Sequence, residues 1–225
     1  MIRYAILYAT VSHDEQRIAS DFFIGDPFKA IPGMIVAATM NINPVMIYFG
    51  QELGERGMDK EGFSGIDGRT SIFDYWSVDS VRNWRNDGSF GNSGLTEEQI
   101  KLRRFYLQLI KIAKEEESIT SGKFFDLMYA NYENPKFDST KQYAFLRSGN
   151  REFILIITNF APQKTEVAVH IPKEAFEYLN IEPKKVKGAK ELFSKKNIPL
   201  SSRWDKMLYV NMEAYSGKII KFYED

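Results

Sequence analysis

The stretch IRYAILYATVSHDEQR, residues 2–17, decides how the start of this chain is interpreted. Residues 2–11 are rich in Ile, Leu, Tyr and Val and almost free of charge, which is typical of a strand buried on both faces of a parallel sheet. The polar run His13-Asp14-Glu15 follows directly. In barrels of parallel strands the chemistry lies at the carboxyl ends of the strands, so this pattern predicts a strand that leads into a functional site.

A helix and a second strand follow in an order that indicates a βαβ unit. Residues 27–41 carry apolar side chains at helical spacing, with Pro32 expected to set the first turn or to kink the helix. Residues 45–49, VMIYF, are a second candidate for a buried strand, which ends at Gly50. This order predicts a parallel sheet, because the crossover of a βαβ unit joins parallel strands.

The chain then combines a long loop with a well-marked helix. Residues 51–94 are rich in glycine and aromatic side chains and show no clear periodicity. A loop of this length is usually functional or disordered, and its aromatic residues argue against disorder. Residues 95–117 are predicted to be helical, since Thr96 and Gln99 have the spacing of a capping box. The helix ends in the acidic run 115–117, which is unfavourable at the negative end of a helix dipole.

From residue 142 onward the apolar residues alternate with polar ones, which predicts an antiparallel β module of the sandwich type. Residues 207–212 and 218–223 are expected to form a hairpin around Ser216-Gly217. Asn, Pro and Asp cluster between residues 131 and 138, where we expect a domain boundary.

Composition limits the function classes. The 225 residues carry 30 basic and 30 acidic side chains, a balance that argues against nucleic acid or an anionic membrane as partner and leaves a neutral ligand such as a sugar compatible. The chain has no cysteine, which excludes disulfides and thiolate metal sites. We expect a soluble protein without a clear signal peptide, and the compartment stays open.

His13-Asp14 matches part of a motif from one enzyme family. In the α-amylase family of glycoside hydrolases the seventh barrel strand ends in Asn-His-Asp, and residues 11–14 read VSHD, with Ser12 in place of the asparagine. Residues 44–52, PVMIYFGQE, resemble the eighth strand with its Gly-x-Glu ending, and residues 102–109 resemble the eighth helix. The chain is thus similar to the C-terminal part of this family, which also ends in a β domain.

The resemblance implies a fold class of α/β plus all-β. Residues 1–131 are expected to be the C-terminal part of a (β/α)8 barrel, its last two βα units, and residues 138–225 an antiparallel β-sandwich-like domain. The activity implied is retaining hydrolysis of α-glucosidic bonds in starch-like glucans.

The resemblance also implies roles for individual residues. Asp14 matches the carboxylate that stabilises the transition state, and His13 matches the imidazole that binds the reacting sugar. Glu52, Trp76 and Trp84 are further candidates for contact with substrate. The alternative for Glu52 is an ion pair with an arginine, and for Trp76 and Trp84 it is packing within their own loop. Arg17 is expected to be structural, pairing with carboxylates around the barrel mouth.

No cofactor or metal is expected. Full-length members of the family can bind calcium, but Asp59, Glu61 and Asp67 lack the spacing of a dedicated calcium loop.

The chain departs from the family because nothing matches the nucleophile or the general acid, which belong to the fourth and fifth barrel strands. We therefore expect a fragment, a truncated product or one half of an assembly that does not hydrolyse starch alone. Open sheet edges would favour self-association or complementation by an N-terminal part. The alternative is a non-catalytic carbohydrate-binding or interaction protein derived from this fold.

Overall fold

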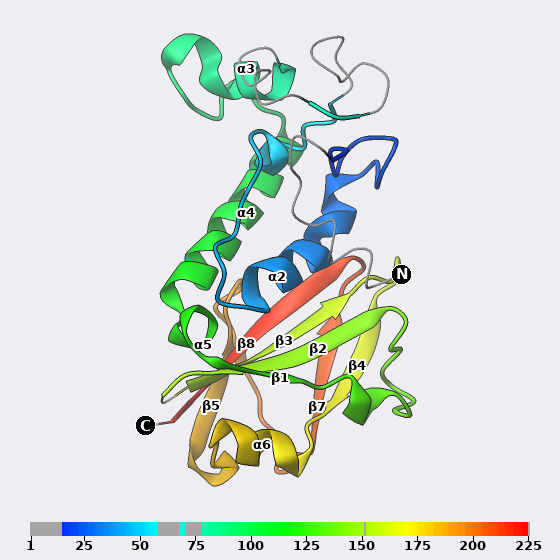
Figure 1. Cartoon of the computed structure of the whole chain (residues 1–225), viewed down its shortest axis with the longest axis vertical. Coiled ribbons are helices and arrows are strands. Elements are labelled where there is room, and N and C mark those ends of the chain that lie inside the picture. Colours follow the sequence, from blue (N-terminus) through cyan, green and yellow to red (C-terminus); the bar gives the residue numbers. More distant parts are fainter. Residues whose placement is uncertain (1–14, 58–67, 71–77, 151, 225) are drawn as a thin grey trace. The chain divides into compact units, whose positions relative to one another are not determined.

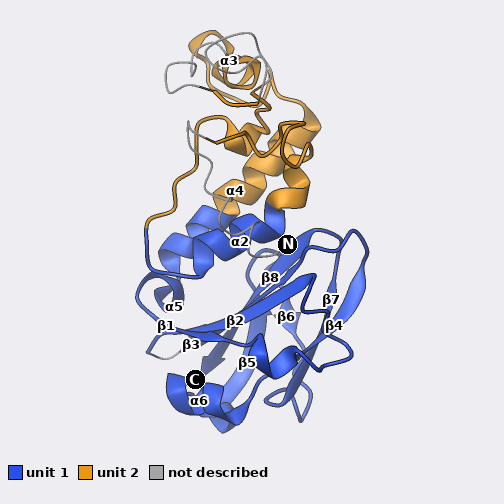
Figure 2. Ribbon diagram, turned by 45° about the vertical axis from the view of Figure 1, so that its right-hand side comes forward, with its two compact units in different colours: residues 1–3, 31–43, 109–225 blue, residues 4–30, 44–108 orange. Residues whose placement is uncertain are grey.

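The computed structural model describes residues 15–57, 68–70, 78–150 and 152–224 (Figure 1). The described chain divides into two compact units (Figure 2). The first contains residues 31–43 and the chain from 109 onward, and the second contains the described parts of 4–30 and 44–108. Each unit combines segments that are distant in sequence, so the units do not coincide with the linear domains expected from the sequence. That division stays a prediction.

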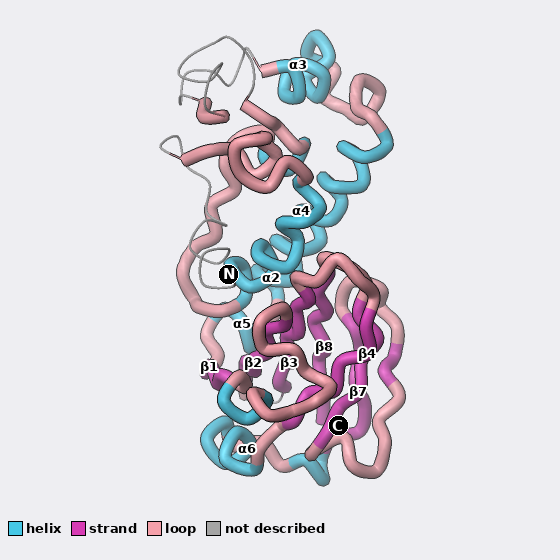
Figure 3. The backbone as a smooth tube through the Cα atoms, turned by 90° about the vertical axis from the view of Figure 1, so that its right-hand side faces the viewer, coloured by secondary structure: helices cyan, strands magenta, loops and turns pink. Residues whose placement is uncertain are grey.

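The first unit is an antiparallel β domain, as the sequence predicts. A six-stranded sheet has the order β1-β2-β3-β8-β5-β6, and β4 and β7 form a separate two-stranded sheet (Figure 3). All pairings between these strands are antiparallel. The strands are β1 (Lys123–Asp126), β2 (Gln142–Ser148), β3 (Glu152–Asn159), β4 (Thr165–His170), β5 (Val186–Glu191), β6 (Asn197–Ile198), β7 (Met207–Met212) and β8 (Ser216–Glu224).

Two expectations about strands are wrong. The segments 207–212 and 218–223 do not form a hairpin, because β7 pairs with β4 while β8 lies between β3 and β5 in the larger sheet. Residues 45–49 contain no strand. A strand needs a neighbour that satisfies its N–H and C=O groups, and none of the described segments pairs with residues 45–49. The first predicted strand, residues 2–11, lies outside the described residues, so the parallel barrel segment stays a prediction.

The helices agree with the sequence at both predicted places. The 3-10 helix η1 (Pro27–Ala30) and helix α2 (Ile31–Thr39) cover most of the segment 27–41, and α4 (Glu97–Glu115) covers most of 95–117. The capping box is formed, since the Thr96 N–H donates to Gln99 Oε1 at 3.0 Å and the Gln99 N–H donates to Thr96 Oγ1 at 3.2 Å. None of the described helices has the length and apolar character to cross a membrane. The α-helices are α2 (Ile31–Thr39), α3 (Asp79–Arg85), α4 (Glu97–Glu115), α5 (Glu117–Thr120) and α6 (Lys173–Leu179). The 3-10 helices are η1 (Pro27–Ala30), η2 (Gln51–Leu53), η4 (Asn86–Gly88), η5 (Tyr129–Asn131) and η6 (Pro183–Lys185).

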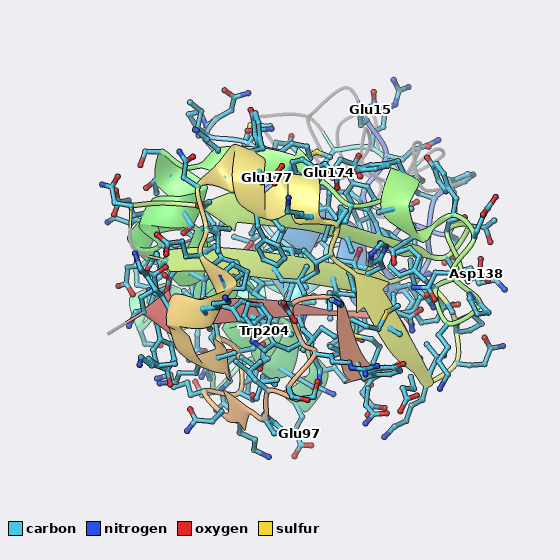
Figure 4. The ribbon with its side chains drawn as sticks, turned by 90° about the horizontal axis from the view of Figure 1, so that it is seen from below. Glu15, Glu97, Asp138, Glu174, Glu177 and Trp204 are labelled. Carbon is cyan, nitrogen blue, oxygen red and sulfur yellow. The ribbon has the colours of Figure 1, made fainter. Side chains whose placement is uncertain are left out.

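The central strands of the larger sheet are covered on both faces. On one face α2 packs so closely that a Cβ on Gly217 of β8 would lie 2.6 Å from Ile35 Cδ1. On the other face Phe153 and Phe222 stack with ring centroids 4.5 Å apart, and Trp204 stacks on Phe222 at 4.9 Å (Figure 4). Burial on both faces explains why β2 and β3 are almost wholly buried.

Two carboxylates of the acidic run 115–117 have partners that are distant in sequence. Glu116 accepts a hydrogen bond from Lys221 Nζ of β8 at 2.7 Å, and Glu117 accepts one from the Asn150 amide at 2.8 Å. Lys221 also forms an ion pair with Glu152 of β3. Burial lowers the pKa of Lys221, but its bonds to Glu116 and Glu152 raise that pKa by more, so the ammonium form is favoured.

Arg147 of β2 ties the helices of the first unit to its sheet. The side chain is 2% exposed, and its guanidinium donates to the Ser118 carbonyl at 3.0 Å, the Ile119 carbonyl at 2.7 Å and the Met40 carbonyl at 3.0 Å. These carbonyls lie in α5 and just beyond the end of α2, where helical carbonyls lack partners within the helix. Burial lowers the pKa of Arg147 from its ordinary value, yet an arginine keeps its charge in proteins.

We expect Arg147→Met to destabilise the protein by about 3 kcal/mol, because three buried carbonyls lose a charged donor. The measurement is the free energy of unfolding in urea. Arg203→Met is the matched control, since Arg203 is exposed and its loss is expected to change stability by less than about 0.5 kcal/mol. Equal effects of the two substitutions would contradict the capping role of Arg147.

Candidate functional site

The structure describes only part of the site predicted from the sequence. His13, Asp14 and Trp76 lie outside the described residues. Glu52 is described and lies on η2, where it is half-buried. The described part of the site therefore comprises Glu52 and the loops of the second unit that follow Asp14 and residue 49 in the sequence.

Arg17, three residues after Asp14, is the centre of these loops. The side chain is fully buried, and Nε donates to Thr70 Oγ1 at 2.7 Å while Nη1 donates to the Phe49 carbonyl at 2.6 Å. The guanidinium also lies over the Tyr48 ring, 4.1 Å from its centroid, a favourable cation–π geometry. One guanidinium thus holds three loop segments together, so Arg17 is structural, while its expected pairing with carboxylates stays a prediction.

A close backbone approach fixes the same loops. The Arg17 N–H donates to the Gly68 carbonyl at 2.8 Å. Gly68 has a φ of +77°, and a Cβ at this position would lie 1.9 Å from Ser20 Oγ. Only glycine is compatible with both the left-handed backbone conformation and this close contact. We therefore expect any side chain at residue 68 to disrupt the packing of these loops.

A buried hydrogen-bond chain runs from Tyr48 to α4. The Tyr48 hydroxyl donates to the Thr70 carbonyl at 3.1 Å, the Tyr48 N–H donates to Gln51 Oε1 at 3.3 Å, and the Gln51 amide donates to the Tyr106 hydroxyl at 3.0 Å. Burial raises the pKa of Tyr106 to about 12, with the Gln51 bond opposing and the charge of Glu52 adding to the rise. The charge of Glu52 therefore acts on the Tyr106 hydroxyl. Contact between Glu52 and a sugar stays a prediction.

Glu55 is a buried carboxylate that the sequence analysis did not single out. It is 6% exposed and accepts hydrogen bonds from the Gly57 N–H at 2.9 Å and from the Ser80 hydroxyl. One partner lies in its own loop and the other in the first turn of α3, so Glu55 joins residues 55–57 to the start of α3. The nearest signal in the sequence is the pair of glycines, Gly54 and Gly57, that flank Glu55 within the loop.

A cleft of about 450 Å³ opens on the same unit, within the usual range for small-ligand sites. Its lining mixes apolar and charged side chains, including Phe28, Leu102, Asp26, Arg56 and Glu98. Arg56 is also paired with Asp21 at 2.6 Å. This mixture of both charges with apolar walls suits a polar ligand without net charge.

Trp84 packs within its own loop, as one of the two interpretations of this residue expects. Its ring meets that of Phe90 edge to face at a centroid distance of 5.3 Å, and the Arg103 guanidinium lies 5.6 Å from its centroid. Among the described residues no group of three or more His, Cys, Asp or Glu side chains is arranged to hold a metal ion. The expectation of no cofactor stays a prediction.

Solved structures of known proteins share the architecture of this chain. Neither the protein-family models nor the curated proteins give a match to this chain. Solved structures do match. AmyP in complex with maltose aligns over 88% of this chain and 36% of its own, at 12% identity and a TM-score of 0.59. The α-amylase from Geobacillus thermoleovorans complexed with acarbose aligns over 89% and 34%, at 14% identity and a TM-score of 0.54.

A third match is trehalose-6-phosphate hydrolase from Bacillus licheniformis, which covers 99% of this chain and 46% of its own at 19% identity and a TM-score of 0.55. The chain has the fold of the C-terminal region of α-amylase family glycoside hydrolases. It spans between about a third and just under half of the length of these α-amylase-type chains. The resemblance inferred from the sequence is thus confirmed at the level of fold.

The buried phenol of Tyr106 gives this α-amylase-like chain a testable dependence on pH. Because burial raises its pKa from 10.0 to about 12, the folded state resists loss of the proton. The stabilisation is complete below pH 10 and is lost as the pH rises through about 12. We expect Tyr106→Phe to remove up to about 2 kcal/mol of the decline in unfolding free energy between pH 10 and 12.

The measurement is urea unfolding at a series of pH values. Tyr209→Phe is the control, because Tyr209 is 56% exposed and its loss should leave the pH profile unchanged. An identical profile for Tyr106→Phe and the wild type would contradict the role assigned to Tyr106.

Proposed function

We propose that this chain is the part of a retaining α-glucosidic hydrolase that supplies the transition-state-stabilising carboxylate, Asp14. The strongest support is the agreement between the order of motifs in the sequence and the fold of the chain. The His13-Asp14 pair and the residues after it follow the order of the family, and the chain has the fold of the C-terminal region of α-amylase family structures.

The proposed substrate is an α-glucan or maltooligosaccharide. Among the proteins of similar fold, AmyP was crystallised with maltose and, as a substituted variant, with maltotriose, and the Geobacillus enzyme with acarbose. A neutral glucan also suits the balanced charge of this chain. We assign sugar contact to His13, Glu52 and Trp76, with the ion-pair and loop-packing alternatives for Glu52 and Trp76 still in competition.

Retaining hydrolysis needs a nucleophile and a general acid about 5–5.5 Å apart on either side of the scissile bond. Asp14 would add a fixed negative charge that favours the oxocarbenium-like transition state over the bound substrate. Such a group acts best when its surroundings are held rigidly. The buried Arg17, with its bonds to Thr70 and Phe49, gives the segment that follows Asp14 this rigid support.

The catalytic contribution is incomplete within these 225 residues, because nothing in them matches the nucleophile or the general acid. We propose that the chain binds sugar but does not turn it over unaided, and that complementation by an N-terminal part restores a full set of carboxylates. The second candidate is a non-catalytic carbohydrate-binding or interaction protein, which the absence of these two matches also favours.

A direct test measures reducing-sugar release from maltoheptaose and soluble starch by the purified chain, together with binding of maltoheptaose by calorimetry. We expect no release above the buffer blank, and we expect binding that weakens at least about threefold in Asp14→Ala and His13→Ala, since each removes a polar contact with sugar. Clear turnover that Asp14→Asn abolishes would overturn the proposed dependence on other carboxylates.

A further inference from the structure

A group of three aromatic rings lies open on the β domain, far along the chain from Asp14. We call Phe125, Tyr129 and Tyr178 the aromatic shelf. Tyr129 and Tyr178 are 55% and 56% exposed, and Phe125 between them is half-buried. Phe125 lies 5.8 Å from Tyr178 and 6.1 Å from Tyr129, centroid to centroid.

The aromatic shelf is held by three elements of the first unit. Phe125 belongs to β1, Tyr129 to η5 and Tyr178 to α6. The side chain of Lys123 fixes the approach of α6 to β1, since its ammonium donates to the Tyr178 carbonyl at 3.4 Å and lies 5.4 Å from the Tyr178 ring centroid. The rings are therefore placed by the fold before any ligand arrives, which lowers the entropic cost of binding.

A carboxylate accompanies the rings. Glu174 lies on α6 beside Glu177 (Figure 4), and its negative charge adds to burial in raising the pKa of Tyr129. Asp126 follows Phe125 on β1 but faces the other side of the strand, where it accepts a hydrogen bond from the Tyr143 hydroxyl at 3.4 Å. Open ring faces thus stand next to the carboxylate of Glu174 and to the hydroxyl groups of two tyrosines.

We propose that the aromatic shelf binds an α-glucan chain. The C–H face of a glucose ring is apolar while its edge carries hydroxyl groups, so a sugar suits both the open rings and the Glu174 carboxylate beside them. Tyrosine suits this task because its ring is apolar and its hydroxyl is polar. The inference rests on the proposed function for the class of ligand, since both take a neutral glucan.

The size of the aromatic shelf favours a sugar over a protein partner. A whole aromatic side chain offers about 150–250 Å², so three partly exposed rings supply at most about 400 Å². A stable protein interface needs about 800 Å² on each partner. Pairing of a foreign strand with β1 is also disfavoured, because β1 has only four residues with Lys123 and Asp126 at its ends, and short charged edges resist strand addition.

The test titrates the intact chain with maltoheptaose and compares dissociation constants. We expect Tyr178→Ala and Tyr129→Ala each to weaken binding about fivefold, in line with the loss of one ring contact, while Tyr178→Phe keeps wild-type affinity. Tyr209→Ala is the matched control, because Tyr209 is also 56% exposed and also has a lysine, Lys136, over its ring at 5.6 Å. It should bind as the wild type does.

The outcomes separate the aromatic shelf from the proposed function. Weaker binding in the two tyrosine variants with little effect of Asp14→Ala supports the aromatic shelf and counts against sugar contact at Asp14. Unchanged binding in both tyrosine variants, with loss in Asp14→Ala, overturns the aromatic shelf alone. A dimer in sedimentation that Tyr178→Ala dissociates would also overturn it, since the rings would then serve a second copy of the chain.

Discussion

The buried guanidinium of Arg147 is the contact on which the β domain depends most. The central sheet is apolar on both faces, so helices must cover it, and short helices leave carbonyls without partners at their ends. Arg147 belongs to the sheet, yet its donors satisfy carbonyls of α5 and of the residue after α2. A single side chain therefore joins the helices to the sheet. It also offsets the free-energy cost of burying the unpaired carbonyls at the helix ends.

The same device recurs in the second unit with different partners. Arg17 is fully buried and serves a hydroxyl from one loop and a carbonyl and an aromatic ring from another. Loops of this length form few regular backbone hydrogen bonds of their own. The several donors of one guanidinium therefore supply the hydrogen bonds between segments that backbone pairing supplies in a sheet. In both units a buried, charged side chain thus stabilises the fold by joining segments that are distant in sequence.

Local sequence signals predict this fold well where the deciding contacts are local. The capping box of Thr96 and Gln99 and the successive strands β2 and β3 depend on near neighbours, and both are confirmed. The segment 45–49 reads as a strand from its residue types, but a strand exists only through a partner that the local sequence does not specify. The expected hairpin between β7 and β8 is wrong for the same reason.

Site residues follow the same rule. His13 and Asp14 attract attention because polar residues after an apolar run are conspicuous, whereas Glu55 looks like one more charge in a polar loop until the fold buries it. The aromatic shelf is still harder to predict from the sequence, because its three residues belong to three different elements and have no regular spacing. Its few half-open rings imply weak binding to one sugar unit. Weak contact of this kind suits a polymer, because every repeat along a glucan offers the rings another equivalent chance to bind.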